Sequence, residues 1–412
     1  MRIDKIRLKN FRCYEETEIE FHPNFNIVIG INGTGKTAVL EALTVAAGSF
    51  FLGIDYAENR HIRPEDIRVL STEFDINEQF PVEVEAWGMI NGEELNWLRE
   101  LTGPKNKTTY VKALAIKELA KNIQERVRSG ENIQLPMVAY YSTERLWKER
   151  SDTTKISGSR LKDGYYNGLK ATSNNKFFTK WFEKEEMVVL QQRKQSVGLQ
   201  VVRKTVSNCV DKCENVYFDF NRRELIMEYE DGRKLPFRYL SDGVRNTLAT
   251  VADIAFRCAM LNPHLGEDAA METEGLVLID ELDLHLHPSW QKEIVNNLKT
   301  SFPKIQFIVT THSPLILSTV QDRIVTMVDG KAYYSVNTYG RTANDVLRNV
   351  MATSERLEEV QDRLDMYFEL IEVGEGFSEN AQNLRQQLEQ DIGYDDPELA
   401  RADVLLAFYD AD

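Results

Sequence analysis

Two adjacent carboxylates, Asp280 and Glu281, follow the short apolar run at residues 276–279. Such a run is typical of a buried strand, and acids that follow it lie at the carboxyl edge of an α/β sheet, where ligands bind. At that edge Asp280 could hold Mg²⁺, and Glu281 could orient or deprotonate an attacking water. Many buried strands end in an acid, so the two carboxylates indicate a catalytic site only if a phosphate-binding site faces them.

The sequence GINGTGKT at residues 30–37 supplies that site, because it matches the eight-position phosphate-loop pattern in full. Apolar residues 25–29 predict a strand before the loop, and the spacing of apolar residues over 35–47 predicts a helix after it. A chance glycine-rich turn is the alternative, and the strand and helix on either side argue against it.

Five residues of the loop could contact a nucleotide. Backbone N–H groups around Asn32, Gly33 and Gly35 could close on phosphate oxygens. Lys36 would place a positive charge on the β and γ phosphates, and the Thr37 hydroxyl could ligate Mg²⁺. The loop predicts binding of a nucleoside triphosphate.

His312 follows the next apolar run, at residues 305–310. A lone histidine is usually structural, but this one shares the expected sheet edge with the carboxylates. We therefore interpret it as a hydrogen-bond partner of the γ-phosphate or of the attacking water.

Ser241, Asp242 and Gly243 precede a long apolar segment that predicts a helix over about 244–261. The simplest interpretation is that Ser241 caps this helix. A helix N-terminus also attracts anions, and the small residues leave its backbone open to a phosphate.

The order of these motifs, GINGTGKT, YLSDGVR, LVLIDELDLHLHP and IVTTHSP, resembles the ATP-binding-cassette ATPases of the SMC, RecF and OLD superfamily. The wording DELDLHLHP with TTHSP, and the tail RTANDVL with DDPELARADVLL, resemble more narrowly the ATPases of bacterial anti-phage systems, such as the Septu ATPase subunit and its retron-associated relatives. The resemblance covers residues 1–45 and 215–330 best.

In that superfamily two heads sandwich ATP and complete each other's sites. The resemblance therefore implies that Lys36, Thr37, Asp280, Glu281 and His312 act within one head. It implies that Ser241, Asp242 and Gly243 reach the γ-phosphate of the partner head, and that Arg12 lies near the nucleotide. Two departures are visible: Asp242 stands where transporters carry glycine, and no clear Q-loop glutamine occurs around residues 63–66.

The expected fold class is α/β: a P-loop NTPase with an ABC/SMC-type head, a mixed central sheet, an antiparallel layer, a helical insertion and a helical tail. We expect four segments, which are the first part of the head, a mainly helical insertion, the second part of the head and a partner-docking tail. Their ranges are 1–92, 93–214, 215–340 and 341–412.

The composition of the chain argues against several other classes of protein. With 50 basic and 65 acidic side chains the formal net charge is −15, which argues against a broad non-specific grip on nucleic acid. The four scattered cysteines do not form a disulfide framework, the N-terminal residues lack the apolar core of a signal peptide, and no apolar run could span a bilayer. We expect a cytoplasmic protein without membrane partners.

Two smaller clusters could suggest other chemistry. Cys209 and Cys213 are spaced to share a helix face but lack further zinc ligands, so we interpret them as buried small hydrophobes. Asp395, Asp396 and Glu398 could belong to a nuclease, but acids favour the first turn of a helix, so we predict a helix start.

These patterns predict a regulatory ATPase with ATP and Mg²⁺ as cofactors, a homodimer or larger homo-oligomer around ATP, and a separate nuclease of HNH type docked by the tail. We expect no nuclease activity from the chain itself. The alternative is a RecF- or SMC-like DNA-repair ATPase, which needs a basic surface. The candidates for that surface are Lys105, Lys107, Lys112 and Lys117, or Arg145, Lys148 and Arg150. A transporter motor fits less well, because it needs a membrane partner and a Q-loop.

Overall fold

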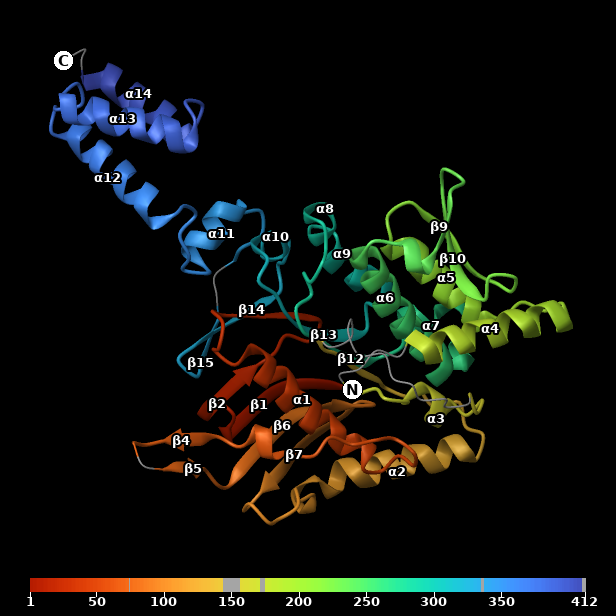
Figure 1. Ribbon diagram of the computed structural model, residues 1–412. Helices are drawn as coiled ribbons and strands as arrows, with labels where there is room; N and C mark the ends of the chain where they lie inside the picture. The colour runs from red at the N-terminus through yellow and green to blue at the C-terminus, as the bar shows by residue number, and fades with distance from the viewer. Residues whose placement is uncertain (74, 144–155, 171–174, 335–336, 410–412) are drawn as a thin grey trace. The chain divides into compact units, whose positions relative to one another are not determined.

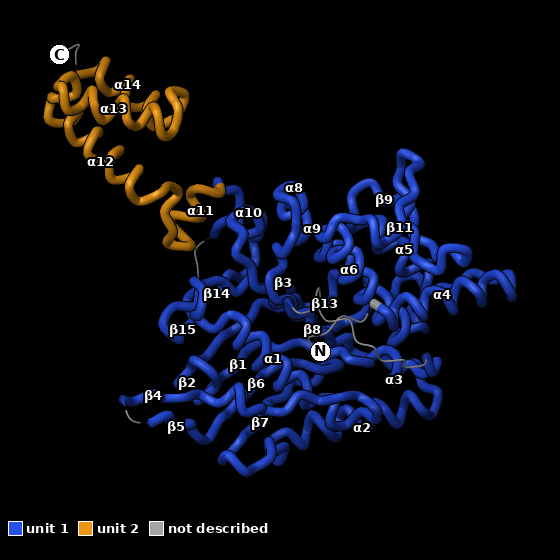
Figure 2. The backbone as a smooth tube through the Cα atoms, viewed as in Figure 1, with its two compact units in different colours: residues 1–342 blue, residues 343–412 orange. Residues whose placement is uncertain are grey.

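The computed structural model describes residues 1–73, 75–143, 156–170, 175–334 and 337–409. The chain forms two compact units, residues 1–342 and 343–412, which Figure 2 distinguishes by colour. Of the candidate basic residues, Arg145, Lys148 and Arg150 lie outside the described residues.

A six-stranded sheet forms the centre of the first unit, in the order β15-β14-β3-β13-β12-β8. All neighbouring strands are parallel except the β14–β15 pair, so the sheet is mixed, as predicted. The strands β3, β13 and β12 are buried along their whole length, which explains their nearly continuous apolar sequence. The strands are β3 (Phe25–Ile29), β8 (Met137–Tyr141), β12 (Gly275–Ile279), β13 (Ile305–Thr310), β14 (Arg323–Val328) and β15 (Lys331–Tyr334).

An antiparallel sheet of order β2-β1-β6-β7 forms the predicted second layer. Along β6 buried and half-buried residues alternate strictly, as one covered face requires. Asn91 and Gly92 join β6 to β7 with φ of 49° and 83°, a two-residue hairpin turn. The strands are β1 (Arg2–Phe11), β2 (Tyr14–Glu20), β6 (Val82–Ile90) and β7 (Glu93–Leu101).

Helix α1 packs against both sheets, contacting β13 of the central sheet and β1, β6 and β7 of the antiparallel sheet. It is buried on nearly all sides, which explains why its sequence is apolar around the whole helix. Trp97 on β7 anchors the packing, because its indole N–H donates to the carbonyl of Ala46 over 2.9 Å. Helix α2 lies beside β7, as Figure 1 shows.

Residues 93–214, expected as a mainly helical insertion, also supply strands to both sheets. β7 pairs with β6 along its whole length, and β8 forms the edge of the central sheet beside β12. Pattern alone did not reveal β8, because its five apolar residues have neither helical nor alternating spacing.

The other helices and strands of the first unit frame this core. Residues 288–301 form two short helices, α8 and α9. The helices are α1 (Lys36–Phe51), α2 (Leu114–Arg128), α3 (Arg160–Gly164), α4 (Asn175–Gln192), α5 (Val197–Cys209), α6 (Asp242–Leu261), α7 (Ala269–Glu272), α8 (Pro288–Gln291), α9 (Ile294–Ser301) and α10 (Pro314–Leu317). The smaller strands are β4 (Val69–Ser71), β5 (Ile76–Glu78), β9 (Cys213–Asp219), β10 (Glu224–Tyr229) and β11 (Lys234–Pro236).

The second unit is helical and has its own core, built from Leu364, Ile371, Leu388 and Leu399 among others. On the last helix Leu399 and Ala402 are buried, whereas Val404 and Phe408 are exposed. The helices are α11 (Ala343–Asn349), α12 (Glu358–Glu372), α13 (Glu379–Ile392) and α14 (Pro397–Tyr409).

Candidate active site

The phosphate loop turns sharply from β3 into α1, and glycine is required at two positions of this turn. Gly30 and Gly35 have φ of 152° and 93°. A Cβ atom on Gly35 would collide with Cys13 and with the Tyr14 hydroxyl, and one on Gly30 would collide with the carbonyl oxygen of Met327. The close approach of these neighbours fixes the path of the loop.

Lys36 opens α1 and bends back over the loop. Its ammonium donates to the carbonyls of Gly30 at 2.7 Å and Ile31 at 3.1 Å. Burial lowers the pKa of Lys36, and the nearby charges of Asp280 and Glu281 oppose that shift. Among the described residues, no side chain caps the first turn of α1, so the N–H groups of that turn are available to an anion. Asn32 and Gly33, in the loop before the helix, are exposed.

Asp280 meets the loop from the opposite side. The strands β3, β13 and β12 are parallel neighbours, so their carboxyl ends share one edge. There the Thr37 hydroxyl donates to Asp280 Oδ2 over 3.0 Å, although 243 residues separate the two side chains. Asp280 is 3% exposed and also accepts from the Thr310 hydroxyl at 2.6 Å. The structure therefore unites the two motifs that the sequence only predicted to face each other.

Glu281 lies just after the end of β12, and His312 lies just after the end of β13. Glu281 has φ of 50°, a left-handed backbone that turns the chain directly after the strand. Its N–H donates to the Thr310 hydroxyl over 2.7 Å. The His312 N–H donates to Asp283 Oδ1 over 3.2 Å, and both Glu281 and His312 are half-buried. The catalytic candidates thus lie on neighbouring strand ends that hydrogen bonds cross-link.

Arg12 is held by carboxylates. Its guanidinium forms ion pairs with Glu41 on α1 and with Asp66, which is fully buried. Arg60 binds the same two acids. Arg12 thereby lies beside α1, next to Glu41, which is five residues after Lys36 on that helix. Residues 63–66, where a Q-loop glutamine would be expected, supply Asp66 instead.

Ser241 and Asp242 form the exposed start of α6, and Gly243, which follows them, is buried. Ser241 is the N-cap, accepting from the Val244 N–H at 3.5 Å, and Asp242 pairs with Arg245. Gly243 packs so tightly on the carbonyl of His285 that a Cβ atom would collide with it. No hydrogen bond among the described residues joins these three residues to the phosphate loop of their own chain.

A family described as "AAA domain" matches residues 5–214, just over half of the chain. The chain belongs to this AAA domain family. A second family, described as "AAA ATPase domain", matches residues 142–317, which include Asp280 and Glu281. The protein is a nucleotide-binding ATPase, as the sequence predicts.

Relatives of this AAA ATPase carry retron and Septu names, and a solved SMC head shares its fold. It is 27% identical to "Retron Vc95 probable ATPase" of Vibrio cholerae serotype O1 biovar El Tor, over 90% of this chain and 84% of that protein. It is 28% identical to "Septu protein PtuA" of Bacillus mycoides (strain KBAB4), over 76% of this chain and 38% of that protein. A solved SmcHead, bound to the C-winged helix domain of ScpA, matches with a TM-score of 0.51 and 18% identity, over 81% of this chain and 98% of that chain. The SMC-type fold and the predicted resemblance are thereby confirmed.

Three residues of the AAA ATPase site were not singled out from the sequence. Thr310 binds Asp280, and Asp283 accepts from the Thr311 hydroxyl at 2.6 Å. The Tyr14 hydroxyl lies 3.2 and 3.0 Å from the carbonyls of Thr34 and Gly35 and donates to the loop. The pair of threonines before His312 could have pointed to Thr310, since it ends a strand at the ligand edge. No local sequence pattern around Tyr14 indicates its contact with the phosphate loop.

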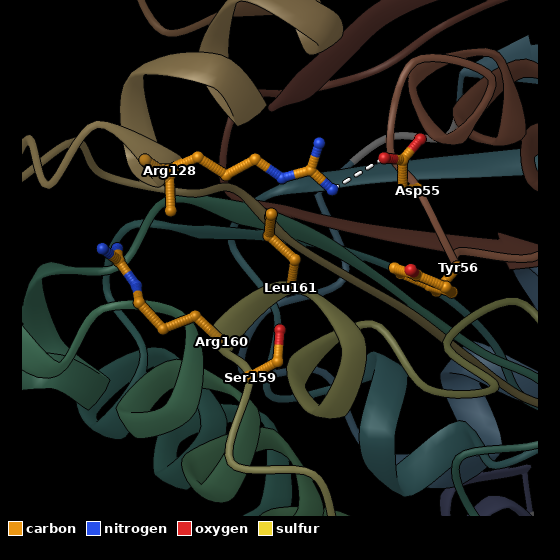
Figure 3. A pocket seen from close by; sticks show the side chains of 7 residues that line it. Asp55, Tyr56, Arg128, Ser159, Arg160 and Leu161 are labelled. Atoms are coloured by element: carbon orange, nitrogen blue, oxygen red, sulfur yellow. Dashed lines mark hydrogen bonds and ion pairs between the residues drawn. The ribbon is translucent and has the colours of Figure 1, made fainter.

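The smaller clusters have structural roles in this ATPase. Cys209 and Cys213 are buried, as predicted, and among the described residues no group of three His, Cys, Asp or Glu could hold a metal. The acids at 395–398 begin α14, where Asp396 accepts from the Glu398 N–H at 2.9 Å. A hollow of about 180 Å³ beside the Arg128–Asp55 ion pair, shown in Figure 3, shares no lining residue with the phosphate loop. Throughout the described residues, every helix falls short of the length and apolar character that a bilayer crossing requires.

Proposed function

We propose that this AAA ATPase binds and hydrolyses ATP as the regulatory subunit of a cytoplasmic anti-phage defence complex. The observation that carries the proposal is the 3.0 Å contact between Thr37 and Asp280, which brings the phosphate loop and the carboxylate strand into one site. The names of the retron and Septu relatives support the biological setting.

The donors at this contact suit Mg²⁺. A hydroxyl and one carboxylate are hard oxygen ligands, and Mg²⁺ takes its remaining ligands from phosphates and water rather than from a full protein cage. Thr37 and Asp280 would hold the ion, which would neutralise charge on the phosphates. Lys36 would bind the β and γ phosphates, Glu281 would orient or deprotonate the attacking water, and His312 would bind the γ-phosphate.

Two heads would close on ATP. Ser241 and Asp242 are exposed at the start of α6. They would therefore contact the γ-phosphate of a second copy, together with the backbone of Gly243. Arg12, beside α1, would add positive charge near the nucleotide. The dimer, or a larger homo-oligomer built from it, would control a separate HNH-type nuclease docked on residues 341–412, and any nucleic-acid contact would come through that complex.

The substitution Glu281→Gln tests this function. It keeps the Asp280 ligand and removes the base, so we expect hydrolysis to fall about 10²- to 10⁴-fold while ATP still binds. The variant should accumulate as an ATP-dependent dimer in light scattering after size exclusion, and Lys36→Ala should bind no ATP. A Glu281→Gln chain that binds ATP and stays monomeric contradicts the sandwich.

A DNA-repair ATPase is the second candidate, favoured by the surface around α2. Residues 105–128 hold seven lysines and arginines against two acids, and Lys117 lies 4.9 Å from the exposed Tyr110 ring. Salt-dependent binding of DNA by the ATP-bound dimer, lost on Lys112→Glu with Lys117→Glu, would favour this candidate.

A further inference from the structure

The metal-ligand candidate Asp280 is supported by residues on both strands that flank β12. On the β13 side, the Thr310 hydroxyl donates to its carboxylate over 2.6 Å. On the β8 side, the Asp280 N–H donates to the carbonyl of Tyr141, the last residue of β8, over 2.8 Å. Within the described residues β8 is the edge of the central sheet, so an element other than a strand must hold its open side. The position of Asp280 therefore depends on what fixes the end of β8.

A buried ion pair on α6 holds this strand end. The Tyr141 hydroxyl donates to Asp253 Oδ2 over 2.7 Å, and Arg257 Nε donates to the same oxygen over 2.8 Å. Asp253 is 6% exposed and Arg257 is 2% exposed, so the pair lies in the core, where α6 packs against β8. Two donors that converge on one oxygen fix the carboxylate, and the carboxylate in turn fixes the tyrosine side chain.

The same arginine also holds the segment that covers the open side of β8. Arg257 Nη1 and Nη2 donate to the carbonyls of Gly164 and Tyr166 over 2.9 and 3.0 Å. Slightly further along this segment, the Gly168 carbonyl accepts from the Tyr140 N–H over 2.7 Å, so the segment lies along the outer edge of the strand. The ion pair therefore links α6, this segment and the end of β8.

Stability alone does not account for the buried pair. Burying two charges costs desolvation energy that their attraction recovers only in part, and apolar replacements are often equally stable. In addition, Asp253 Oδ1 has no hydrogen-bond partner among the described residues. Apolar side chains would fill the same space but would not fix the direction of the Tyr141 hydroxyl.

We propose that Asp253 and Arg257 are positioning residues for Mg²⁺ binding. Through Tyr141 they set the backbone of Asp280, and with it the placement of the carboxylate beside Thr37. This inference rests on the proposed function, in which Asp280 and Thr37 hold the ion. It adds that the affinity for Mg²⁺ depends on a buried ion pair that acts only through the end of β8.

The test measures the Mg²⁺ concentration that gives half-maximal ATP hydrolysis by the full chain. Tyr141→Phe should raise this concentration about fivefold, which is the factor that the loss of one hydrogen bond of average net strength gives. ATP binding in EDTA, followed by titration calorimetry, should not change, because Lys36 and the loop N–H groups would bind the phosphates without the metal. A change confined to the Mg²⁺ requirement distinguishes positioning from a general loss of structure.

A second variant replaces the ion pair by apolar residues of similar size, Asp253→Leu with Arg257→Met. Its thermal unfolding midpoint should stay at or above that of the wild type, whereas its Mg²⁺ requirement should rise as in Tyr141→Phe. Adding Tyr141→Phe to this variant should raise the requirement little further, because the carboxylate that the hydroxyl contacts is already gone. Tyr141→Phe, which leaves the ion pair intact, decides the question if the apolar variant fails to fold.

Tyr165→Phe is the matched control, because the Tyr165 hydroxyl donates to the Pro136 carbonyl over 2.9 Å, just before the opposite end of β8. It should leave the Mg²⁺ requirement unchanged. An unchanged requirement in Tyr141→Phe, or an equal rise in Tyr165→Phe, overturns the proposal. Asp280→Asn separates this inference from the proposed function. If Asp280→Asn raises the requirement and Tyr141→Phe does not, only the positioning role is wrong; if Asp280→Asn leaves it unchanged, the metal site itself is wrong.

Discussion

The Thr310 hydroxyl donates a hydrogen bond of 2.6 Å to Asp280 and accepts one of 2.7 Å from the N–H of Glu281. One buried side chain on β13 therefore orients the proposed metal ligand and the backbone of the proposed base, both at the end of β12. Thr310 touches neither nucleotide nor water in the proposed mechanism, so it is a positioning residue.

Replacing Thr310 by valine should impair hydrolysis more than ATP binding. Valine keeps the branched shape but removes one of the donors to the Asp280 carboxylate and the hydroxyl acceptor of the Glu281 N–H, at a cost of about 1–3 kcal/mol in the free energy of unfolding. We expect kcat to fall with little change in KM for ATP, measured by steady-state phosphate release. Thr310→Ser retains the hydroxyl and should preserve kcat; equal losses in both variants would show that the methyl group, rather than the hydrogen bonds, matters.

Tyr14→Phe should loosen the phosphate loop. The Tyr14 hydroxyl donates to loop carbonyls, and burial raises its pKa well above the ordinary value, so it is a neutral donor at neutral pH. Losing this hydrogen bond should cost about 1 kcal/mol and raise the Kd for ATP several-fold, as titration calorimetry can measure. An unchanged Kd would limit Tyr14 to filling space beside Gly35.

Asp66→Asn should destabilise the fold strongly. Asp66 is fully buried and pairs with Arg60 at 2.9 Å and Arg12 at 3.2 Å, so an amide removes one of the two carboxylates that these guanidinium groups share and leaves them only Glu41. We expect a loss of roughly 3–5 kcal/mol in the free energy of unfolding, measured by urea denaturation. The adjacent Glu65→Gln is the matched control: the Arg63–Glu65 pair is 56% exposed on both sides, so its loss should stay within about 0.5 kcal/mol.

Ser241→Arg should block dimer formation without affecting ATP binding. Ser241 is exposed, so arginine fits the free chain but would enter the proposed interface. In the Glu281→Gln background we expect the ATP-dependent dimer to disappear in light scattering, with the Kd for ATP of one head unchanged. Asn77→Arg, on the exposed strand β5, serves as the control substitution. A full-size dimer in the Ser241→Arg chain would place α6 outside the interface.

The sequence by itself determined the parts whose physical demands are local. The phosphate loop is recognisable because glycine, lysine and threonine must occupy fixed positions within eight residues, and Asn91-Gly92 sets a hairpin by its own backbone preference. The apolar run before Asp280 likewise predicts a buried strand without knowledge of its neighbours.

Only the tertiary structure decided which distant residues meet. The order of strands in the central sheet brings Asp280 to Thr37 and Thr310 and makes β8 an edge strand rather than part of an insertion. Packing outside that sheet pairs Arg12 with Asp66. In the second unit, helix packing buries Leu399 and Ala402 of α14 and leaves Val404 and Phe408 exposed. These outcomes depend on pairing and packing between segments far apart in the chain, which no local pattern encodes.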